Sequence, residues 1–113
     1  MVVHIVEDDD AVADALAIAL ENMDHHPKTY SDGETFLSCA SWSAGDWVIV
    51  DLGLPGISGS DLVRQLKEQP DPPRVVAITG KPYVSLVRLL RDLPGLTILR
   101  KPLSIEMLFA ALA

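Results

Sequence analysis

Acidic side chains in this sequence follow directly on short aliphatic runs. Glu7 and Asp8 come after the run 2–6, and Asp51 comes after the run 47–50. If the fold brings these three carboxylates together, they repel one another, and at least one is driven towards protonation. A hard divalent cation relieves this repulsion, and Mg²⁺ is the ion that proteins hold through one or two carboxylates plus water and phosphate. The sequence therefore predicts a metal site for Mg²⁺, with Mn²⁺ as the alternative ion.

Two more polar residues stand at equivalent places along the chain. Thr79 ends the run 74–79, and Lys101 comes just after the run 96–99. The cation and the lysine together neutralise the three carboxylates, so that the site can receive a phosphoryl group. Carboxylates form aspartyl phosphates in other phosphoryl-transfer proteins, which makes Asp51 the expected nucleophile. We therefore expect phosphoryl transfer to Asp51, assisted by the Thr79 hydroxyl and the Lys101 ammonium.

These polar residues can meet only if the chain aligns the strand ends that carry them. Short β-branched runs alternate with longer runs of helical periodicity, which predicts a parallel sheet covered by helices on both faces. Right-handed crossovers then give an open, doubly wound sheet, whose ligands bind beyond the carboxyl ends of the strands. The expected strands are 2–6, 26–30, 47–50, 74–79 and 96–99. The expected helices are 10–23, 31–37, 83–93 and 104–113, together with one that starts within 58–61 and extends to at least residue 66.

Several other residues are expected to serve the fold alone. Ser31-Asp-Gly-Glu34 has the pattern of a capping box at the start of a short helix. Asp10 is the expected cap of the helix 10–23. His4 lies in a predicted strand without metal-ligand spacing, so we interpret it as structural. Cys39 is expected to be a small buried or half-buried apolar residue.

Length and composition limit the classes of protein that remain. The chain has 113 residues, the size of one domain, and 49% of them are hydrophobic, which is enough for one core. A net charge of −7 argues against direct nucleic-acid binding, because phosphate backbones attract basic surfaces. No apolar run could span a membrane, the start lacks a signal-peptide pattern, and a single cysteine fits a reducing compartment. We therefore expect one cytoplasmic domain, 1–113, without a membrane partner.

Four motifs resemble the signatures of response-regulator receiver domains of two-component signalling. They are Val6-Glu7-Asp8-Asp9, Asp51-Leu-Gly-Leu-Pro55-Gly-Ile-Ser-Gly59, Ala77-Ile-Thr79-Gly80 and Arg100-Lys101-Pro102. Asp8 precedes Asp51 by 43 residues, Thr79 follows 28 residues later, and Lys101 follows after 22 more. One such motif alone is weak, but four in this order, each at a predicted strand end, are specific. The resemblance covers the whole chain and implies a flavodoxin-like α/β fold with strand order 2-1-3-4-5.

The resemblance also implies a phosphoacceptor and its metal ligands. Asp51 would accept phosphate from the phosphohistidine of a histidine kinase or phosphotransfer protein. Asp8 would bind Mg²⁺ directly, Glu7 would support the ion through water, and the Gly53 carbonyl would be a further ligand. Position 7 departs from the family, which more often has Asp there, but one extra methylene suits an outer role.

The remaining roles concern the switch that follows phosphorylation. Thr79 would contact the phosphoryl group and shift on activation, and Lys101 would pair first with the carboxylate and then with the phosphate. The Lys101–Pro102 peptide is usually cis in this family. Ile98 stands where the family usually has Tyr or Phe, so the usual coupling of a threonine to an aromatic ring is missing. Signalling through movement of the segment 80–93 is the expectation in its place.

The implied function is a signalling phosphoacceptor that assists its own phosphorylation and dephosphorylation, and not an enzyme. A receiver that acts as a phosphorylation-independent interaction module is the alternative, and it rests on Ile98. A haloacid-dehalogenase-type phosphatase would need a second acid where Gly53 stands. A flavodoxin-like FMN carrier would need a Ser/Thr-rich loop after the first strand, and a P-loop protein would need a glycine-rich phosphate motif that the sequence lacks.

The last two predicted helices carry more apolar residues than one core-facing stripe requires. This surplus over 83–113 predicts a partner surface, for a homodimer or for an output domain. The short final helix further suggests a receiver excised from a longer protein, with an output domain after residue 113.

Overall fold

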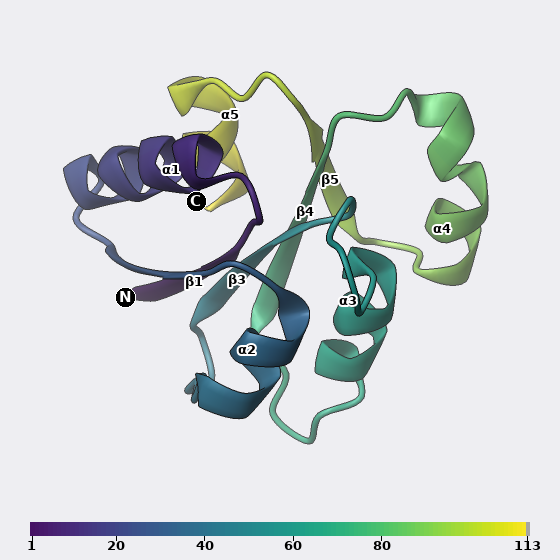
Figure 1. Cartoon of the computed structure of the whole chain (residues 1–113), viewed down its shortest axis with the longest axis horizontal. Coiled ribbons are helices and arrows are strands. Elements are labelled where there is room, and N and C mark those ends of the chain that lie inside the picture. The colour runs from purple at the N-terminus through teal and green to yellow at the C-terminus, as the bar shows by residue number, and fades with distance from the viewer. Residues whose placement is uncertain (113) are drawn as a thin grey trace.

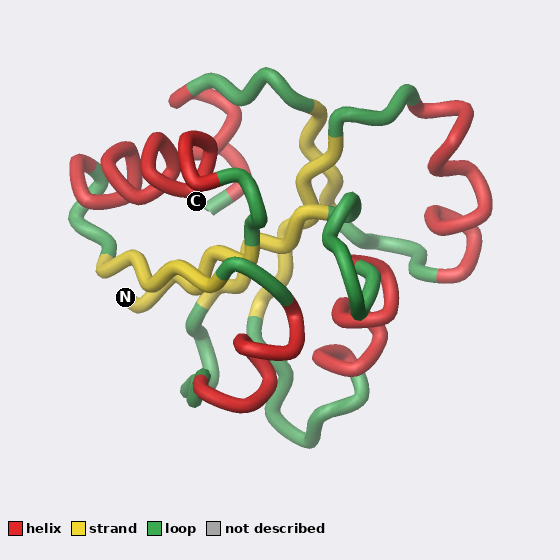
Figure 2. Tube along the Cα trace, in the orientation of Figure 1, coloured by secondary structure: helices red, strands yellow, loops and turns green. Residues whose placement is uncertain are grey.

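The computed structural model describes residues 1–112. Its strands are β1 (Val2–Val6), β2 (His26–Tyr30), β3 (Trp47–Asp51), β4 (Arg74–Thr79) and β5 (Thr97–Arg100). Its helices are α1 (Asp10–Asn22), α2 (Gly33–Cys39), α3 (Gly59–Lys67), the 3₁₀ turn η1 (Tyr83–Leu86), α4 (Val87–Asp92) and α5 (Ile105–Ala111). Strands and helices alternate along the chain, as the tube in Figure 2 shows, and the predicted α/β fold is confirmed.

The sheet is parallel, and its strand order β2-β1-β3-β4-β5 is the predicted one. Helices α1 and α5 cover one face, and α2, α3 and α4 cover the other (Figure 1). The order of winding reverses between β1 and β3, which are neighbours in register, with Val6 opposite Val50. Residues that directly follow these two strands are therefore forced to the same edge of the sheet.

Alternating side chains of the central strands supply two cores. Val3 and Ile5 of β1 pack under α1 and α5, with Leu16 and Leu108. On the other face, Val6 packs with residues of α2 and α3 and with the neighbouring strand β3. Because both faces are covered, the central strands β1 and β3 are mostly runs of buried aliphatic residues, which is the pattern that predicted them from the sequence.

Two helix caps lie one residue away from their predicted positions. Asp9, not Asp10, caps α1, and its side chain accepts the N–H groups of Ala11 and Val12. Asp32, not Ser31, caps α2. Two residues that can cap a helix stand next to one another at both sites, so composition alone does not fix which one takes the extended cap conformation.

The predicted helix 83–93 is wrong as a single element. The structure divides it into the 3₁₀ turn η1 and α4, and Leu86, which is buried, lies at the division with φ −107° and ψ −2°. No side chain caps either half among the described residues. Spacing of apolar residues does not separate a 3₁₀ turn from an α-helical turn over so few residues, and uncapped short helices lack a fixed start.

Smaller differences concern the end of the chain and the cysteine. β5 runs from Thr97 to Arg100, one residue later than predicted. The last residue of the predicted helix 104–113 lies outside the described residues. Cys39 is exposed, contrary to the prediction, because it ends α2 on the solvent side next to Ser38. No helix among residues 1–112 is both long and apolar enough to cross a membrane.

His4 is fully buried, as a structural role requires, and its ring is packed among aromatic side chains. Its Nδ1 lies 3.0 Å from the Tyr30 hydroxyl, and its Nε2 lies 4.0 Å from a carboxylate oxygen of Asp46. Burial lowers the pKa of His4 below its ordinary value of 6.5, the Asp46 carboxylate opposes this shift, and Lys28 adds to it. Just below pH 6.5, His4 therefore stays neutral in the folded protein, whereas the same ring takes up a proton in the unfolded chain.

We expect this burial to destabilise the protein in mild acid. Above pH 6.5 the ring is neutral in both states; as pH falls below 6.5, only the unfolded chain gains the proton, so stability is lost, by at most about 1.4 kcal/mol per pH unit. Urea unfolding between pH 7.5 and 5 should show this loss in the parent relative to His4→Phe. The exposed His26→Phe serves as control, and parallel curves for the parent and His4→Phe would contradict the prediction.

Candidate functional site

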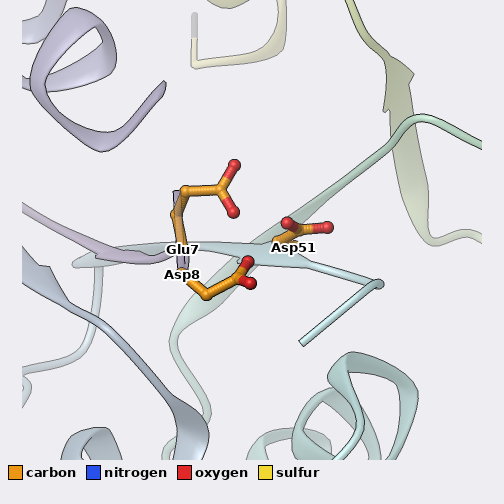
Figure 3. Close-up of side chains that lie close together, drawn as sticks. All are labelled: Glu7, Asp8 and Asp51. Atoms are coloured by element: carbon orange, nitrogen blue, oxygen red, sulfur yellow. The ribbon is translucent and has the colours of Figure 1, made fainter. Parts of the chain in front are cut away.

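Three carboxylates meet at the carboxyl edge of the sheet, as the sequence predicted. Glu7 and Asp8 directly follow β1, Asp51 ends β3, and one oxygen from each lies within 4.8 Å of the others. Figure 3 shows the three side chains converging on one space from two neighbouring strands. Glu7 and Asp51 are buried, and Asp8 is exposed, so the cluster opens to solvent on one side.

Lys101, which directly follows the edge strand β5, completes the cluster. Its Nζ donates to Glu7 Oε1 at 2.8 Å and to Asp51 Oδ2 at 3.1 Å. The Lys101 N–H donates to the carbonyl oxygen of Thr79 at 2.8 Å, which fixes the start of this segment beside β4. The Lys101–Pro102 peptide is cis, as the family resemblance implied. One ammonium group thus bridges two carboxylates that are 44 residues apart in the sequence.

Burial and mutual contact move the pKa values of these groups in opposite directions. Burial and the contact with Asp51 together raise the pKa of Glu7 to about 7, although the Lys101 ammonium opposes both. Burial alone would also raise the pKa of Asp51, but contacts with Glu7, the Gly53 N–H and Lys101 outweigh it and hold this pKa below its ordinary value. The two carboxylates raise the pKa of Lys101 against the effect of burial. Asp51 is therefore the carboxylate that stays ionised, which is the state that its predicted role as nucleophile requires.

The residues at this edge fit a divalent cation. The second carboxylate oxygen of Glu7, Oε2, is buried and has no hydrogen-bond partner among the described residues. A buried carboxylate oxygen without a partner is costly, and a cation between Glu7, Asp8 and Asp51 would satisfy it. The donors are all oxygens, which is the set that Mg²⁺ or Mn²⁺ prefers.

The loop after β3 holds Asp51 from the other side. The Gly53 N–H donates to Asp51 Oδ1 at 2.8 Å, so each oxygen of Asp51 has its own donor. Further along the loop, Gly59 packs directly on the main-chain carbonyl of Asp51, and a β-carbon there would collide with it. The main chain thus comes close to Asp51 at both ends of the loop. Gly53 lies where a metal-binding carbonyl is predicted, and that role stays a prediction.

Thr79 lies at the end of β4, at the same edge, and is buried. Its hydroxyl accepts the N–H of Lys81 at 3.0 Å and makes no hydrogen bond to the three carboxylates. Ile98, in β5, packs partly buried against the core beneath α2, α3 and α4. The predicted site residues thus lie on one edge of the sheet. Gly53 contacts Asp51 through its main-chain N–H, and Thr79 contacts Lys101 through its main-chain carbonyl.

One contact beside the site was not predicted. Glu34, which the sequence pattern assigned to a capping box, does not cap α2. Its Oε1 accepts the N–H of Ile57, at 3.3 Å, in the loop that follows Asp51. The sequence signal for this contact is Gly56, which lacks a β-carbon and so admits a close neighbour, but a single glycine does not identify that neighbour.

A family model agrees with this geometry over nearly the whole chain. The model of the response regulator receiver domain matches residues 3–113. The curated relatives include the tetrathionate response regulatory protein TtrR of Salmonella typhimurium, 30% identical over 110 residues, which are 97% of this chain and 53% of that protein. The sensory transduction protein RegX3 of Mycolicibacterium smegmatis is 37% identical over 79 residues, 70% of this chain and 34% of its own length. The chain thus spans about half the length of TtrR, and its match covers a smaller share, 34%, of the length of RegX3.

Solved structures share the same fold. A response regulator receiver domain (CheY-like) from Methylobacillus flagellatus superposes with a TM-score of 0.83 at 29% identity, covering 100% of this chain and 98% of that one. The response regulator StyR gives a TM-score of 0.84 at 27% identity, with 98% of this chain and 56% of StyR covered. These similarities extend across the acidic cluster, the loop after β3 and the segment that carries Lys101.

Proposed function

The chain belongs to the response-regulator receiver-domain family of two-component signalling, and on this premise we propose that it accepts a phosphoryl group on Asp51 from the phosphohistidine of a histidine kinase or phosphotransfer protein. The observation that carries the proposal is the pairing of Asp51 with both the acidic cluster and Lys101. Phosphorylation then switches a partner or output surface. In this proposal the chain is a signalling phosphoacceptor that assists its own phosphorylation and dephosphorylation, and it is not an enzyme.

Asp51 is arranged to attack phosphorus. The Gly53 N–H and the Lys101 ammonium each hold one carboxylate oxygen, which fixes the direction of the other lone pairs. As the bond between an Asp51 oxygen and phosphorus forms, the bond between phosphorus and the donor imidazole nitrogen breaks and its electron pair stays on that nitrogen. The other ring nitrogen of the donor carries a proton, so the histidine leaves as neutral imidazole. Lys101 and the Thr79 hydroxyl stabilise the charge on the transferring oxygens.

A Mg²⁺ ion would be held by Glu7, Asp8, Asp51 and the Gly53 carbonyl, with Mn²⁺ as the substitute. When bound, it would neutralise negative charge that the carboxylates and the phosphoryl oxygens share. Glu7 would contribute Oε2, which has no hydrogen-bond partner within residues 1–112, and the exposed Asp8 would leave the ion open to solvent. Lys101, which donates to Glu7 in the structure, would bind the phosphoryl group once Asp51 carries it.

Incubation with acetyl phosphate tests the function directly. With Mg²⁺ present, the intact mass should rise by one phosphoryl group, and chelation should prevent the gain. No gain under either condition would favour the alternative, a phosphorylation-independent interaction module. That alternative rests on Ile98 alone, whereas the proposal is supported by the whole cluster of Glu7, Asp51 and Lys101.

Metal binding should depend on pH because of Glu7. Its pKa of about 7 in the metal-free protein means that below this pH a proton must leave before the carboxylate can meet a cation. We expect Mg²⁺ affinity to rise with pH up to about 7, by at most about tenfold per pH unit, and to level off above it. Calorimetry in two buffers of different ionisation enthalpy should detect the released proton. Glu7→Gln should flatten the profile, and an equally flat profile for the parent would contradict the assignment.

The donor protein has apolar surface to pack against beside the site. A groove of about 890 Å³ between α1 and α5 reaches Lys101 and Pro102 at the phosphorylation edge. Its walls are almost entirely apolar, with Ile18 and Ile105 exposed at its margin. A helix of a kinase or phosphotransfer protein that seats here would present its phosphohistidine towards Asp51.

The face formed by residues 83–112 is proposed as the output surface, for a homodimer or an output domain following residue 113 in a longer protein. Val84, Val87 and Phe109 are exposed there, and α4 has no fully buried residue. We expect light scattering to show a larger mass after phosphorylation than before it. A monomer in both states, with no output domain attached, would remove the dimer. We propose a cytoplasmic location for the protein, and nucleic acid and membrane are not proposed as partners of this domain.

A further inference from the structure

We propose that Glu34 is a positioning residue for the phosphoacceptor, acting by clasping the loop 53–58 that follows Asp51 onto the start of α2. The proposal rests on the proposed function, since it concerns the geometry of Asp51. Glu34 lies outside the acidic cluster and on a different element from every residue assigned to the site. Two contacts join α2 to this loop. They involve Gly33 and Glu34 in the helix, and Gly56 and Ile57 in the loop.

The first contact is polar. Glu34 Oε1 accepts the N–H of Ile57, and the carboxylate lies so close over Gly56 that a β-carbon there would collide with Glu34 Oε2. Gly56 also has a φ of +68°, which a side chain disfavours. The loop thus presents bare main chain to a carboxylate at its exposed apex.

The second contact is apolar and adjacent. Gly33 is buried, and a β-carbon added to it would lie 3.5 Å from Ile57 Cβ, so the main chain of α2 faces the Ile57 side chain directly. The N–H of Ile57 thus donates to Glu34, and the side chain of Ile57 packs against Gly33. Both partners lie in the first turn of α2. Asp32 caps this helix by accepting the Thr35 N–H, which leaves the Glu34 carboxylate free to reach across.

The loop transmits this anchoring to Asp51. At its near end, the Gly53 N–H donates to Asp51 Oδ1, and Leu54 is buried in the core. Between Leu54 and the clasp stand only Pro55, with its fixed φ, and Gly56. Glu34 therefore restrains the segment 53–57 at Ile57. At its other end, Gly53 orients an Asp51 oxygen through its N–H and carries the carbonyl predicted to bind the metal.

The acceptor role and the charge of Glu34 can be separated by substitution. Glu34→Ala removes the acceptor, whereas Glu34→Gln keeps an acceptor oxygen and removes the charge. We expect Glu34→Ala to slow phosphorylation by acetyl phosphate about fivefold, the effect of one lost hydrogen bond, and Glu34→Gln to stay within about twofold of the parent. Glu68→Ala, an exposed acid at the end of α3, should match the parent.

A second readout needs no phosphorylation. Hydrogen exchange at the Gly53 and Ile57 amides should quicken in metal-free Glu34→Ala and return towards the parent rate in Glu34→Gln. If the parent took up no phosphoryl group, the proposed function would fail, while the exchange data would still decide on the clasp. Exchange and rate unchanged in Glu34→Ala would overturn the clasp, and so would a Gln variant that behaves like the Ala variant.

Discussion

Asp51→Asn should lose all detectable uptake of a phosphoryl group from acetyl phosphate. The amide has no ionised oxygen to attack phosphorus, whereas the parent Asp51 is held ionised by Glu7, the Gly53 N–H and Lys101. The side chains have nearly the same shape, and the Asn oxygen can still accept one of the hydrogen bonds that Asp51 accepts from Gly53 and Lys101. The fold should therefore persist while the chemistry stops. Intact mass spectrometry with Mg²⁺ present measures the result.

The matched control is Asp61→Asn. Asp61 lies in the first turn of α3, is exposed and pairs with Arg64, so its substitution changes charge by the same amount near the same edge. This variant should gain one phosphoryl group like the parent. A full gain in Asp51→Asn would mean that another residue accepts the group, and the assignment of Asp51 would be wrong.

Lys101→Met should slow phosphorylation by about 100-fold or more. Methionine keeps much of the length of the side chain but removes the ammonium that bridges Glu7 and Asp51. Loss of one preorganised charged donor at a reacting oxygen costs about 10²–10³ in rate. Initial rates with acetyl phosphate, followed by mass, give the comparison with the parent.

The control for this variant removes a lysine that lies away from the site. Lys67→Met changes an exposed residue at the end of α3, and its rate should equal that of the parent. Circular dichroism of both variants checks that the sheet is intact. A rate for Lys101→Met within about threefold of the parent would show that the ammonium plays no part in the transfer, because such a loss falls well below that of one donor.

Much of this site could be predicted because its geometry follows from topology. Parallel strands end at one edge, and once aliphatic runs mark β1 and β3, the acids that follow them must converge. Glu7, Asp8 and Asp51 are found together for this reason. Lys101 follows the last strand, and its predicted pairing with a carboxylate is present, extended to a second one.

What escaped prediction depends on local choices between near-equivalent residues. Asp9 and Asp10 are both good caps, and the position of the first helical residue decides between them. Likewise Glu34 matches a capping box, but Asp32 takes the cap, and a contact 23 residues away in sequence then becomes available to Glu34. Such contacts depend on how a loop packs against a helix, which apolar periodicity does not encode.

The most direct test of the account is a Mg²⁺ titration of the ¹³C-labelled protein, followed through its side-chain carboxylate signals. One ion should saturate the protein, and the signals of Glu7, Asp8 and Asp51 should move together along one binding curve. Signals that stay still at these three residues, or that move only at exposed acids such as Asp61 and Asp71, would contradict it.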